Sequence, residues 1–226
     1  MIFAAGFGTR MGAMTKDLPK PLLAVNGRTL IDRALDLADG AGIAKKVVNL
    51  HYRGDQIANH LAPRGDVSLS WERDQILETG GGLRAALPLL GMGPVFTLNP
   101  DVVWAGPNPL IQLRDAWDAA TMDVLLLLLP MHRVKGRDGR ADFQLAPDGR
   151  IARAGSTGEH LYVGAQIIQT DGLADITAPA FSLNVLWDQM IADKRAFGLV
   201  YQGDWCDVGT PAGLTDAEAM LAAHAV

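Results

Sequence analysis

The start of the chain constrains the fold most, because a short apolar segment runs straight into a glycine-rich turn. Residues 1–4 are Met-Ile-Phe-Ala, and the next eight are Ala-Gly-Phe-Gly-Thr-Arg-Met-Gly. Glycine lets a backbone approach an oxyanion closely and present its N–H groups to it. Open α/β sheets bind ligands in this way, just beyond the carboxyl ends of their strands. The start therefore predicts an α/β protein with a phosphate-binding loop.

Two cations accompany this loop. Arg10 lies within the turn, and Lys20 stands between Pro19 and Pro21. A guanidinium can bind two phosphate oxygens at once, and an ammonium adds a mobile point charge. The two prolines restrict the backbone on either side of the lysine, which holds its side chain in place. We interpret residues 4–22 as a device for holding a nucleoside triphosphate.

A dinucleotide-binding turn of the Rossmann dehydrogenase type is the alternative. Gly6, Gly8 and Gly12 loosely match G-x-G-x-x-G, but the last spacing is one residue too long. In the dehydrogenase turn the helix begins at once. Residues 16–21 contain two prolines and cannot be helical throughout. The triphosphate interpretation is therefore preferred.

Strand and helix patterns alternate along the chain. We expect strands at 1–4, 46–51, 67–71, 94–98, 124–129, 162–169 and 198–201, and helices at 29–38, 55–61, 82–90, 110–120, 183–193 and 211–223. A hairpin over 141–151 is predicted from the turn signal at Asp148-Gly149. Such alternation implies βαβ units. We predict a mixed, mainly parallel, doubly wound sheet of Rossmann-like type in three layers.

Composition narrows the partners. The 226 residues are 49% hydrophobic, which is ample for a core, and the formal net charge of −5 disfavours a general nucleic-acid partner. The apolar run 125–129 is too short to span a bilayer. The single Cys206 suits a reducing compartment. We expect a cytoplasmic protein without nucleic-acid or membrane partners.

The segment Ala4–Leu22 resembles the signature of the sugar-phosphate nucleotidyltransferases, A-A-G-x-G-x-R-M followed by P-K-P-L. The resemblance extends over nearly the whole chain. It implies one domain, residues 1–226, with a nucleotide-binding half (about 1–120) and a sugar-phosphate-binding half (about 121–226). It also implies transfer of a nucleotidyl group from a nucleoside triphosphate to a sugar 1-phosphate, with Mg²⁺ as cofactor. Arg10 and Lys20 are then catalytic, and the nucleotide contacts include Ala4, Ala5, Gly6, Gly8 and Thr9.

A second motif, residues 77–82, is Leu-Glu-Thr-Gly-Gly-Gly. It resembles the nucleobase-binding segment of short uridylyltransferases in this family. The resemblance makes Glu78, Thr79, Gly81 and Gly82 nucleotide-binding residues, with glycines that let a flat base approach the backbone. The alternative is a plain loop in which Thr79 caps the following helix.

Two aspartates are the candidate metal ligands. Asp101 ends an apolar strand, where a carboxylate reaches the ligand crevice of an open sheet, and Mg²⁺ favours one or two carboxylates plus phosphate oxygens. Pro100 stands where the family usually has glycine, so a backbone N–H is missing there. Asp207 lies in a segment resembling the family motif W-x-D-V-G-T. One alternative is that Asp101 is only a turn residue. A separate alternative is that Asp204, rather than Asp207, is the second metal ligand.

The sugar side is marked by Gly-Arg-Ala-Asp-Phe at 139–143. This resembles G-R-G-D-F of the N-acetylmuramate-1-phosphate uridylyltransferases. By that resemblance Asp142 binds sugar hydroxyls and Arg140 faces a phosphate or the lactyl carboxylate. We also expect Asn49 and Asn184 to line the pocket. The lysine of an E-K-P motif in longer relatives is absent, and the nearby candidates to replace it, Arg153 and His160, are better explained as surface groups.

The resemblance favours UTP and N-acetylmuramate 1-phosphate as substrates. A mannose- or glucose-1-phosphate nucleotidyltransferase that uses GTP or another triphosphate is the first alternative. The second is a catalytically weak regulator that senses nucleotides or sugars. Retention of Lys20, Asp101 and Asp207 argues against the regulator. We expect a monomer or a weak homo-oligomer.

Overall fold

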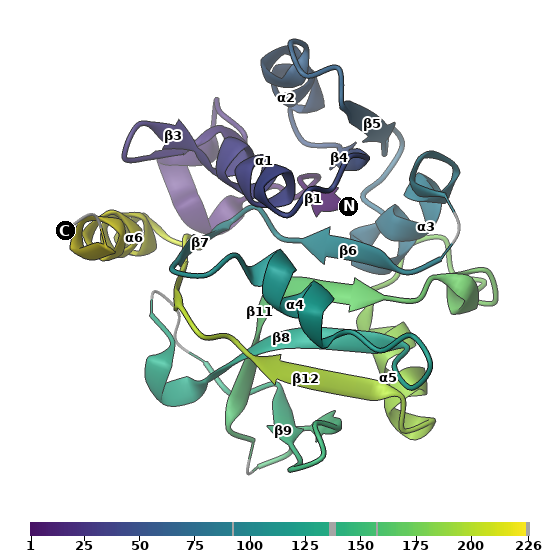
Figure 1. Cartoon of the computed structure of the whole chain (residues 1–226). Coiled ribbons are helices and arrows are strands. Elements are labelled where there is room, and N and C mark those ends of the chain that lie inside the picture. Colours follow the sequence, from purple (N-terminus) through teal and green to yellow (C-terminus); the bar gives the residue numbers. More distant parts are fainter. Residues whose placement is uncertain (92, 136–138, 157, 225–226) are drawn as a thin grey trace.

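One mixed sheet forms the centre of the protein, and four parallel strands form one side of that sheet (Figure 1). The computed structural model describes residues 1–91, 93–135, 139–156 and 158–224. The four strands are β1 (Ile2–Phe3), β4 (Lys46–Leu50), β5 (Val67–Trp71) and β6 (Val95–Leu98). Their spatial order is β6, β1, β4, β5, with β5 at the edge of the sheet, and each neighbouring pair is parallel. Their carboxyl ends therefore meet at one edge, as in other open α/β sheets.

Further strands extend the sheet beyond β6. They are β8 (Val124–Pro130), β9 (Phe143–Leu145), β10 (Ile151–Arg153), β11 (His160–Ile168) and β12 (Ala196–Val200). β11 is antiparallel to both β6 and β8, and β12 is parallel to β8. β9 and β10 pair antiparallel, as the predicted hairpin requires. The prediction of a mixed, mainly parallel sheet is confirmed.

Helices cover both faces of the sheet. One face packs against α1 (Leu30–Gly40), α2 (Gly54–Leu61) and α4 (Pro109–Ala116), through an apolar cluster that includes Leu35, Ile57 and Leu113. The other face packs against α3 (Glu78–Leu90) and α5 (Asn184–Ala192), through a cluster that includes Leu83 and Trp187. The two clusters lie on opposite sides of the sheet and give the predicted three layers.

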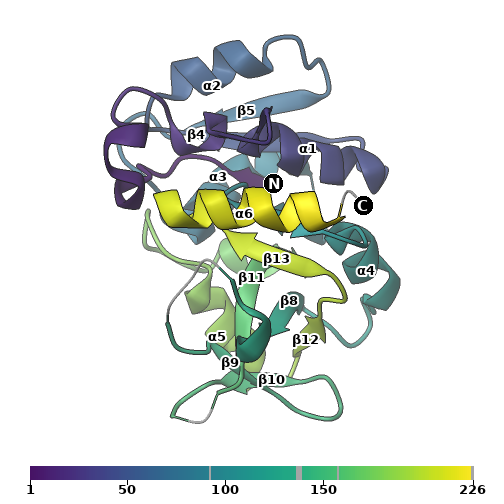
Figure 2. The same ribbon diagram turned by 90° about the vertical axis from the view of Figure 1, so that its left-hand side faces the viewer.

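A separate two-stranded ribbon is a feature that sequence analysis missed. β7 (Val102–Ala105) and β13 (Asp204–Asp207) pair antiparallel, and the closing helix α6 (Pro211–His224) lies along β13 (Figure 2). A third apolar cluster joins this unit to the glycine-rich loop, through Met11, Val103, Cys206 and Ala217. The ribbon therefore brings the segment after Asp101 beside the segment that ends at Asp207.

The helix bounds differ from prediction by more than two residues at two places. The helix predicted at 82–90 begins already at Glu78. The helix predicted at 110–120 ends at Ala116, because Trp117 is extended and the Asp118 carboxylate accepts hydrogen bonds from Ala120 N (3.0 Å) and Thr121 Oγ1 (2.8 Å). Such side-chain hydrogen bonds offer the backbone an alternative to the helical conformation.

Four further short elements are β2 (Ala24–Val25), β3 (Arg28–Thr29), η3 (Met131–Arg133) and η4 (Asp171–Leu173).

Cys206 is a packing residue, as predicted. It is fully buried within β13, and burial raises the pKa of its thiol to about 11. Because the thiolate is the reactive form, we expect the native protein to resist a disulfide reagent at about pH 8, whereas unfolded protein reacts completely. Absorbance after addition of the reagent, with and without denaturant, checks this. Rapid reaction of the native protein would contradict the burial.

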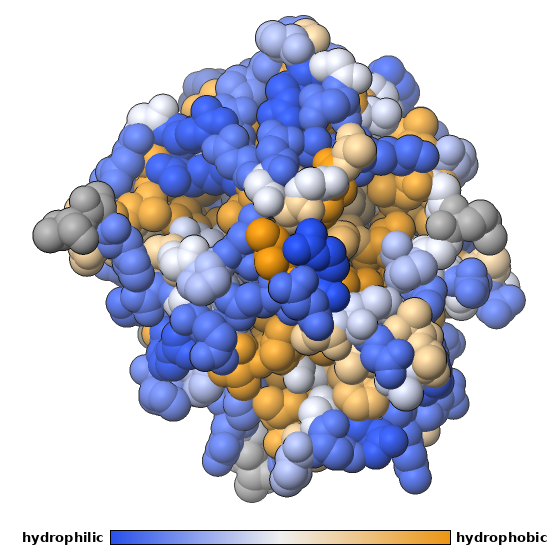
Figure 3. All heavy atoms as spheres, viewed as in Figure 1, coloured by the Kyte–Doolittle hydropathy of each residue, from blue (hydrophilic) through white to orange (hydrophobic). Residues whose placement is uncertain are grey.

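Within the described residues, no helix combines the length and apolar character needed to cross a membrane. On the face seen in Figure 3, hydrophobic residues appear in groups among hydrophilic ones.

Candidate active site

A cavity of about 330 Å³ opens where the parallel strands end. Its walls come from the end of β1 and the glycine-rich loop, from the ends of β4, β5 and β6, and from the start of α3. The lining residues are Phe3, Ala4, Ala5, Gly6, Gly8, Thr9, Arg10, Lys20, Pro21, Asn49, Glu72, Ile76, Glu78, Thr79, Asn99, Pro100, Asp101 and Gly209. Thus the residues predicted to bind nucleotide lie together here, except Gly81 and Gly82. We call this the main pocket.

The glycine-rich loop is shaped around Lys20. Gly8 adopts a left-handed conformation (φ 65°), and a Cβ placed on it would lie 2.9 Å from the Cβ of Lys20. Both features require glycine at this position. The loop continues into a short helix η1 (Thr9–Thr15), and Lys20 begins a second one, η2 (Lys20–Leu22). The sequence thus holds the Lys20 side chain against the loop.

Lys20 and Asp101 form an ion pair at the edge of the main pocket. The Lys20 Nζ donates to Asp101 Oδ2 at 2.6 Å, although the two residues are 81 positions apart in sequence. The lysine side chain is only 9% exposed, whereas the aspartate side chain is 33% exposed. A buried ammonium needs a partner, and the aspartate supplies it. The carboxylate also faces the pocket, so it is placed to receive a second cation.

Asp207 approaches the same place from β13. The Val208 N–H donates to the Asp101 carbonyl at 2.9 Å, which joins the ends of the ribbon. A Cβ on Gly209 would lie 3.0 Å from both Asp207 Oδ1 and Arg10 Nη1. Gly209 therefore lies beside both the carboxylate and the guanidinium, where a larger side chain would press against both groups. Asp207 is 5% exposed and does not itself line the main pocket.

The two aspartates suit a magnesium ion. The described residues contain no group of three or more His, Cys, Asp or Glu side chains arranged for a metal. A site with fewer carboxylates still matches Mg²⁺, which completes its octahedron with phosphate oxygens and water. Because Asp101 faces the pocket and Asp207 lies behind Gly209, the residues present fit a metal that arrives with a phosphate ligand.

A buried chain of polar groups supports the opposite wall. The Ala4 N–H donates to Asn49 Oδ1 (2.8 Å), Asn49 Nδ2 donates to Glu72 Oε1 (2.6 Å), and Leu77 N donates to Glu72 Oε2 (2.8 Å). Asn49 and Glu72 are each only 3% exposed. The chain links β1, β4, the end of β5 and the start of α3. It fixes the wall of the pocket and confirms that Asn49 lines it.

Replacement of Glu72 by glutamine should break this chain. The amide can accept only through its one oxygen, so either Asn49 Nδ2 or Leu77 N loses its acceptor while buried. We expect a loss of about 1–3 kcal/mol in the free energy of unfolding, measured by urea denaturation. Asp74→Asn is the matched control, because Asp74 is exposed on the same loop. Equal stabilities of the two variants would show that the chain is dispensable.

The start of α3 differs from the prediction that its glycines leave the backbone open to a base. The N–H groups of Gly80 and Gly81 both donate to the Phe181 carbonyl, at 2.8 and 3.1 Å. A Cβ on Gly80 would lie 2.3 Å from the Phe181 ring, and one on Gly81 2.6 Å from the Pro179 carbonyl. A Cβ on Gly82 would lie 2.6 Å from Glu72 Oε1. These three glycines pack against the protein itself, and only Glu78 and Thr79 of the motif line the main pocket.

The residues predicted for the sugar lie apart from the main pocket. Arg140 lines a shallow hollow of about 560 Å³ with Met131, Gly139, Ala141, Gly155, Ser156 and Gly158. Asp142 Oδ2 accepts a hydrogen bond from Tyr162 N at 3.0 Å, which ties it to β11. Asn184 donates through Nδ2 to Ser182 Oγ at 2.9 Å and lines neither space. Their roles toward a sugar stay predictions.

Arg153 and His160 differ in whether their polar side-chain atoms already have partners in the protein. Arg153 donates to Asp188 Oδ1 at 2.7 Å, and its guanidinium lies over the rings of Phe143 and Trp187. It is therefore committed to α5 and β9. His160 lines a second hollow of about 580 Å³, and its buried Nδ1 has no hydrogen-bond partner among the described residues. Partial burial lowers the pKa of the His160 imidazole.

Several lining residues escaped sequence analysis, notably Glu72, Ile76, Asn99 and Gly209. Glu72 and Asn99 each follow directly after a parallel strand. The rule that ligands bind beyond strand ends, which identifies Asp101, applies equally to Glu72 and Asn99. Gly209 depends on the ribbon of β7 and β13, which no clear sequence pattern indicates.

This fold and pocket define a nucleotide-binding α/β protein, with cations beside a glycine-rich loop and carboxylates beside them. Residues 1–136 match the family model described as MobA-like NTP transferase domain. The chain therefore belongs to the MobA-like NTP transferases, and the resemblance to nucleotidyltransferases seen in its motifs is confirmed.

Two curated relatives match along almost their whole length. The chain is 41% identical to N-acetylmuramate alpha-1-phosphate uridylyltransferase of Caulobacter vibrioides, with 98% of this chain and 96% of the relative covered. It is 32% identical to the protein of the same name from Neisseria meningitidis serogroup B, with 99% and 98% covered. Among solved structures, HddC from Yersinia pseudotuberculosis superposes with a TM-score of 0.78 at 19% identity, over 97% of each chain. That likeness confirms the fold.

Proposed function

We propose that the protein transfers a uridylyl group from UTP to N-acetylmuramate 1-phosphate, giving a UDP-sugar and pyrophosphate. The observation that supports this most is the main pocket, which joins the glycine-rich loop, Arg10, Lys20 and Asp101 in one cavity. The substrate pair rests on the 41% identity to a uridylyltransferase over 98% of the chain. Mannose- and glucose-1-phosphate nucleotidyltransferases are the alternative outcome of the test below.

The reaction needs positioning and charge stabilisation. An oxygen of the sugar phosphate attacks the α-phosphorus of the triphosphate, and the bond to the β-phosphate oxygen breaks as pyrophosphate leaves. The attacking phosphate is already anionic at neutral pH, so no general base is required. Arg10 and Lys20 stabilise the negative charge that develops on the α-phosphate and on the departing pyrophosphate. The N–H groups of the glycine-rich loop hold the remaining phosphate oxygens.

Asp101 and Asp207 would hold the magnesium ion. The ion would supply positive charge that offsets the negative charge of the phosphates. Lys20 Nζ bonds Asp101 through Oδ2 at 2.6 Å, so the carboxylate can keep this pair and offer Oδ1 to the ion. The triphosphate would add phosphate oxygens that the Lys20 ammonium can also contact.

The sugar 1-phosphate would lie against the C-terminal half, residues 121–226. β11 continues past the end of β6, and its first residues stand beside the hollow lined by Arg140. Arg140 lies in that hollow at a position suited to an anionic group of the sugar. We further propose that the protein acts in the cytoplasm as a monomer or weak homo-oligomer.

The test is pyrophosphate release from UTP, dTTP, GTP and CTP, each combined with the 1-phosphates of N-acetylmuramate, N-acetylglucosamine, mannose and glucose. We expect the highest kcat/KM for UTP with N-acetylmuramate 1-phosphate. A clear preference for GTP with mannose 1-phosphate would replace this assignment by the alternative. Tight nucleotide binding without turnover of any pair would favour the sensing regulator.

A further inference from the structure

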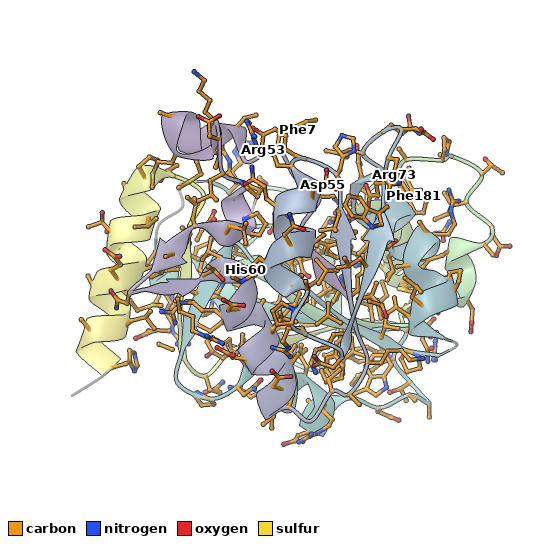
Figure 4. The ribbon with its side chains drawn as sticks, turned by 90° about the horizontal axis from the view of Figure 1, so that it is seen from above. Phe7, Arg53, Asp55, His60, Arg73 and Phe181 are labelled. Atoms are coloured by element: carbon orange, nitrogen blue, oxygen red, sulfur yellow. The ribbon has the colours of Figure 1, made fainter. Side chains whose placement is uncertain are left out.

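Two backbone N–H groups at the start of α3 are already engaged within the protein. The N–H groups of Gly80 and Gly81 are both used by the Phe181 carbonyl, and Arg84 holds the same loop by donating to the Ala178 and Pro179 carbonyls at 2.7 and 3.2 Å. In the view of Figure 4, Phe181 lies to the right of Phe7 and Arg53. This loop closes the first turn of the helix. Recognition of the base must therefore come from other groups of the main pocket.

Apart from Asp101, which pairs with Lys20, the charged side chains of the main pocket come from two regions. Arg10 and Lys20 come from the glycine-rich loop and its continuation, whereas Glu72 and Glu78 come from the end of β5 and the start of α3. A triphosphate is placed at the cationic end by its charge. The base then faces the end with two carboxylates. Because an ionised carboxylate only accepts hydrogen bonds, a carboxylate there can bind an N–H donor of the base.

The carboxylates of Glu72 and Glu78 differ in whether they already accept hydrogen bonds from the protein. Both oxygens of Glu72 already accept bonds, from Asn49 Nδ2 and Leu77 N, and its side chain is buried. Glu78 lines the same pocket and is exposed, and the structure shows no hydrogen bond or ion pair of its carboxylate with any described residue. Glu78 is thus the carboxylate that is available to a ligand.

The backbone of Glu78 supports a functional reason for its presence. Its φ is +59°, in the left-handed region that non-glycine residues rarely adopt and that costs free energy. Residues held in this way cluster at ligand sites, where the surrounding structure keeps them in the strained conformation. Glycine would adopt the same conformation without cost, and the next three positions are glycine. A glutamate here is better explained by its carboxylate than by its backbone.

We infer that Glu78 is the residue that selects the base, by accepting the N3–H of uracil on its carboxylate. Uracil presents this donor between two carbonyl oxygens, whereas cytosine has an unprotonated N3 at the same place. The carboxylate and the cytosine N3 would both be acceptors and would leave each other without a donor. The inference rests on the proposed function insofar as UTP is the substrate.

Calorimetric binding of UTP, dUTP and CTP to the whole protein, with Mg²⁺ and without any sugar phosphate, tests this. The key variant is Glu78→Gln, because the glutamine amide can donate to the cytosine N3 and still accept from uracil. We expect the ratio of UTP to CTP affinity to fall about tenfold or more, with the ratio of UTP to dUTP affinity unchanged. Asp74→Asn removes the same charge from an exposed position on the same loop and should change neither ratio.

Glu78→Gly serves as the second variant, because glycine relieves the left-handed backbone and keeps the fold. We expect its melting temperature to equal or exceed that of the parent, while UTP affinity falls about tenfold. A UTP to CTP ratio unchanged in both variants would overturn the inference. A change in the UTP to dUTP ratio alone would assign Glu78 to the ribose hydroxyls and overturn it as well. If the parent binds UTP well but transfers it to no sugar, the proposed function fails and this inference stands.

Discussion

Replacement of Lys20 by methionine is expected to lower turnover by about 10²–10³, the usual cost of removing one preorganised charge-stabilising group. The side chain is nine-tenths buried, and its Nζ lies 2.6 Å from Asp101, so it is held in position before any substrate arrives. Methionine keeps the length and the apolar stem. The loss should therefore appear in kcat, measured by steady-state pyrophosphate release, more than in the packing of the loop.

Lys16→Met is the matched control. Lys16 is exposed and follows η1 in the same segment, and its side chain lines no part of the main pocket. It should retain the turnover of the parent. Thermal denaturation of both variants separates loss of activity from loss of fold. Near-normal kcat in Lys20→Met, in a protein that melts like the parent, would remove Lys20 from the mechanism.

The sequence was sufficient for the parts of the site that local patterns encode. Gly8 and Lys20 are close in the chain, and the demands on them, a left-handed φ and a fixed side chain, follow from glycine and proline chemistry. The parallel sheet follows from alternating strand and helix patterns. Asp101 follows from the rule for strand ends. In each case the information lies within a few residues.

The parts that were missed depend on contacts between distant segments. β7 and β13 are short strands that pair with each other, although about a hundred residues separate them in sequence. The sequence predicts that the glycines after Glu78 leave room for a base; in the structure Gly80 and Gly81 leave room for the loop at 179–181, and Gly82 leaves room for the Glu72 side chain. A glycine in the sequence indicates only that some group, from a ligand or from the protein, approaches the backbone closely. The sequence does not distinguish a ligand from another part of the chain.

Replacement of Asp207 or Asp101 by asparagine is expected to raise the Mg²⁺ concentration needed for half-maximal turnover and to lower the maximal rate. Each change removes one negative ligand from a cation that takes only one or two carboxylates from a protein. The two variants should differ in one respect. Asp101→Asn also deprives the buried Lys20 ammonium of its partner, so its melting temperature should fall.

The Mg²⁺ dependence of pyrophosphate release is measured for both variants beside Asp204→Asn. Asp204 lies on the same strand β13, but its carboxylate bonds His224 Nε2 at 2.9 Å, at the far end of α6 from the main pocket. This control should keep the magnesium requirement of the parent. If Asp207→Asn instead behaves like the parent and Asp204→Asn shows the raised requirement, the ligand of β13 is Asp204. A parent-like requirement in Asp101→Asn would leave Asp101 as the counter-ion of Lys20 alone, with its role confined to holding that ammonium beside the glycine-rich loop.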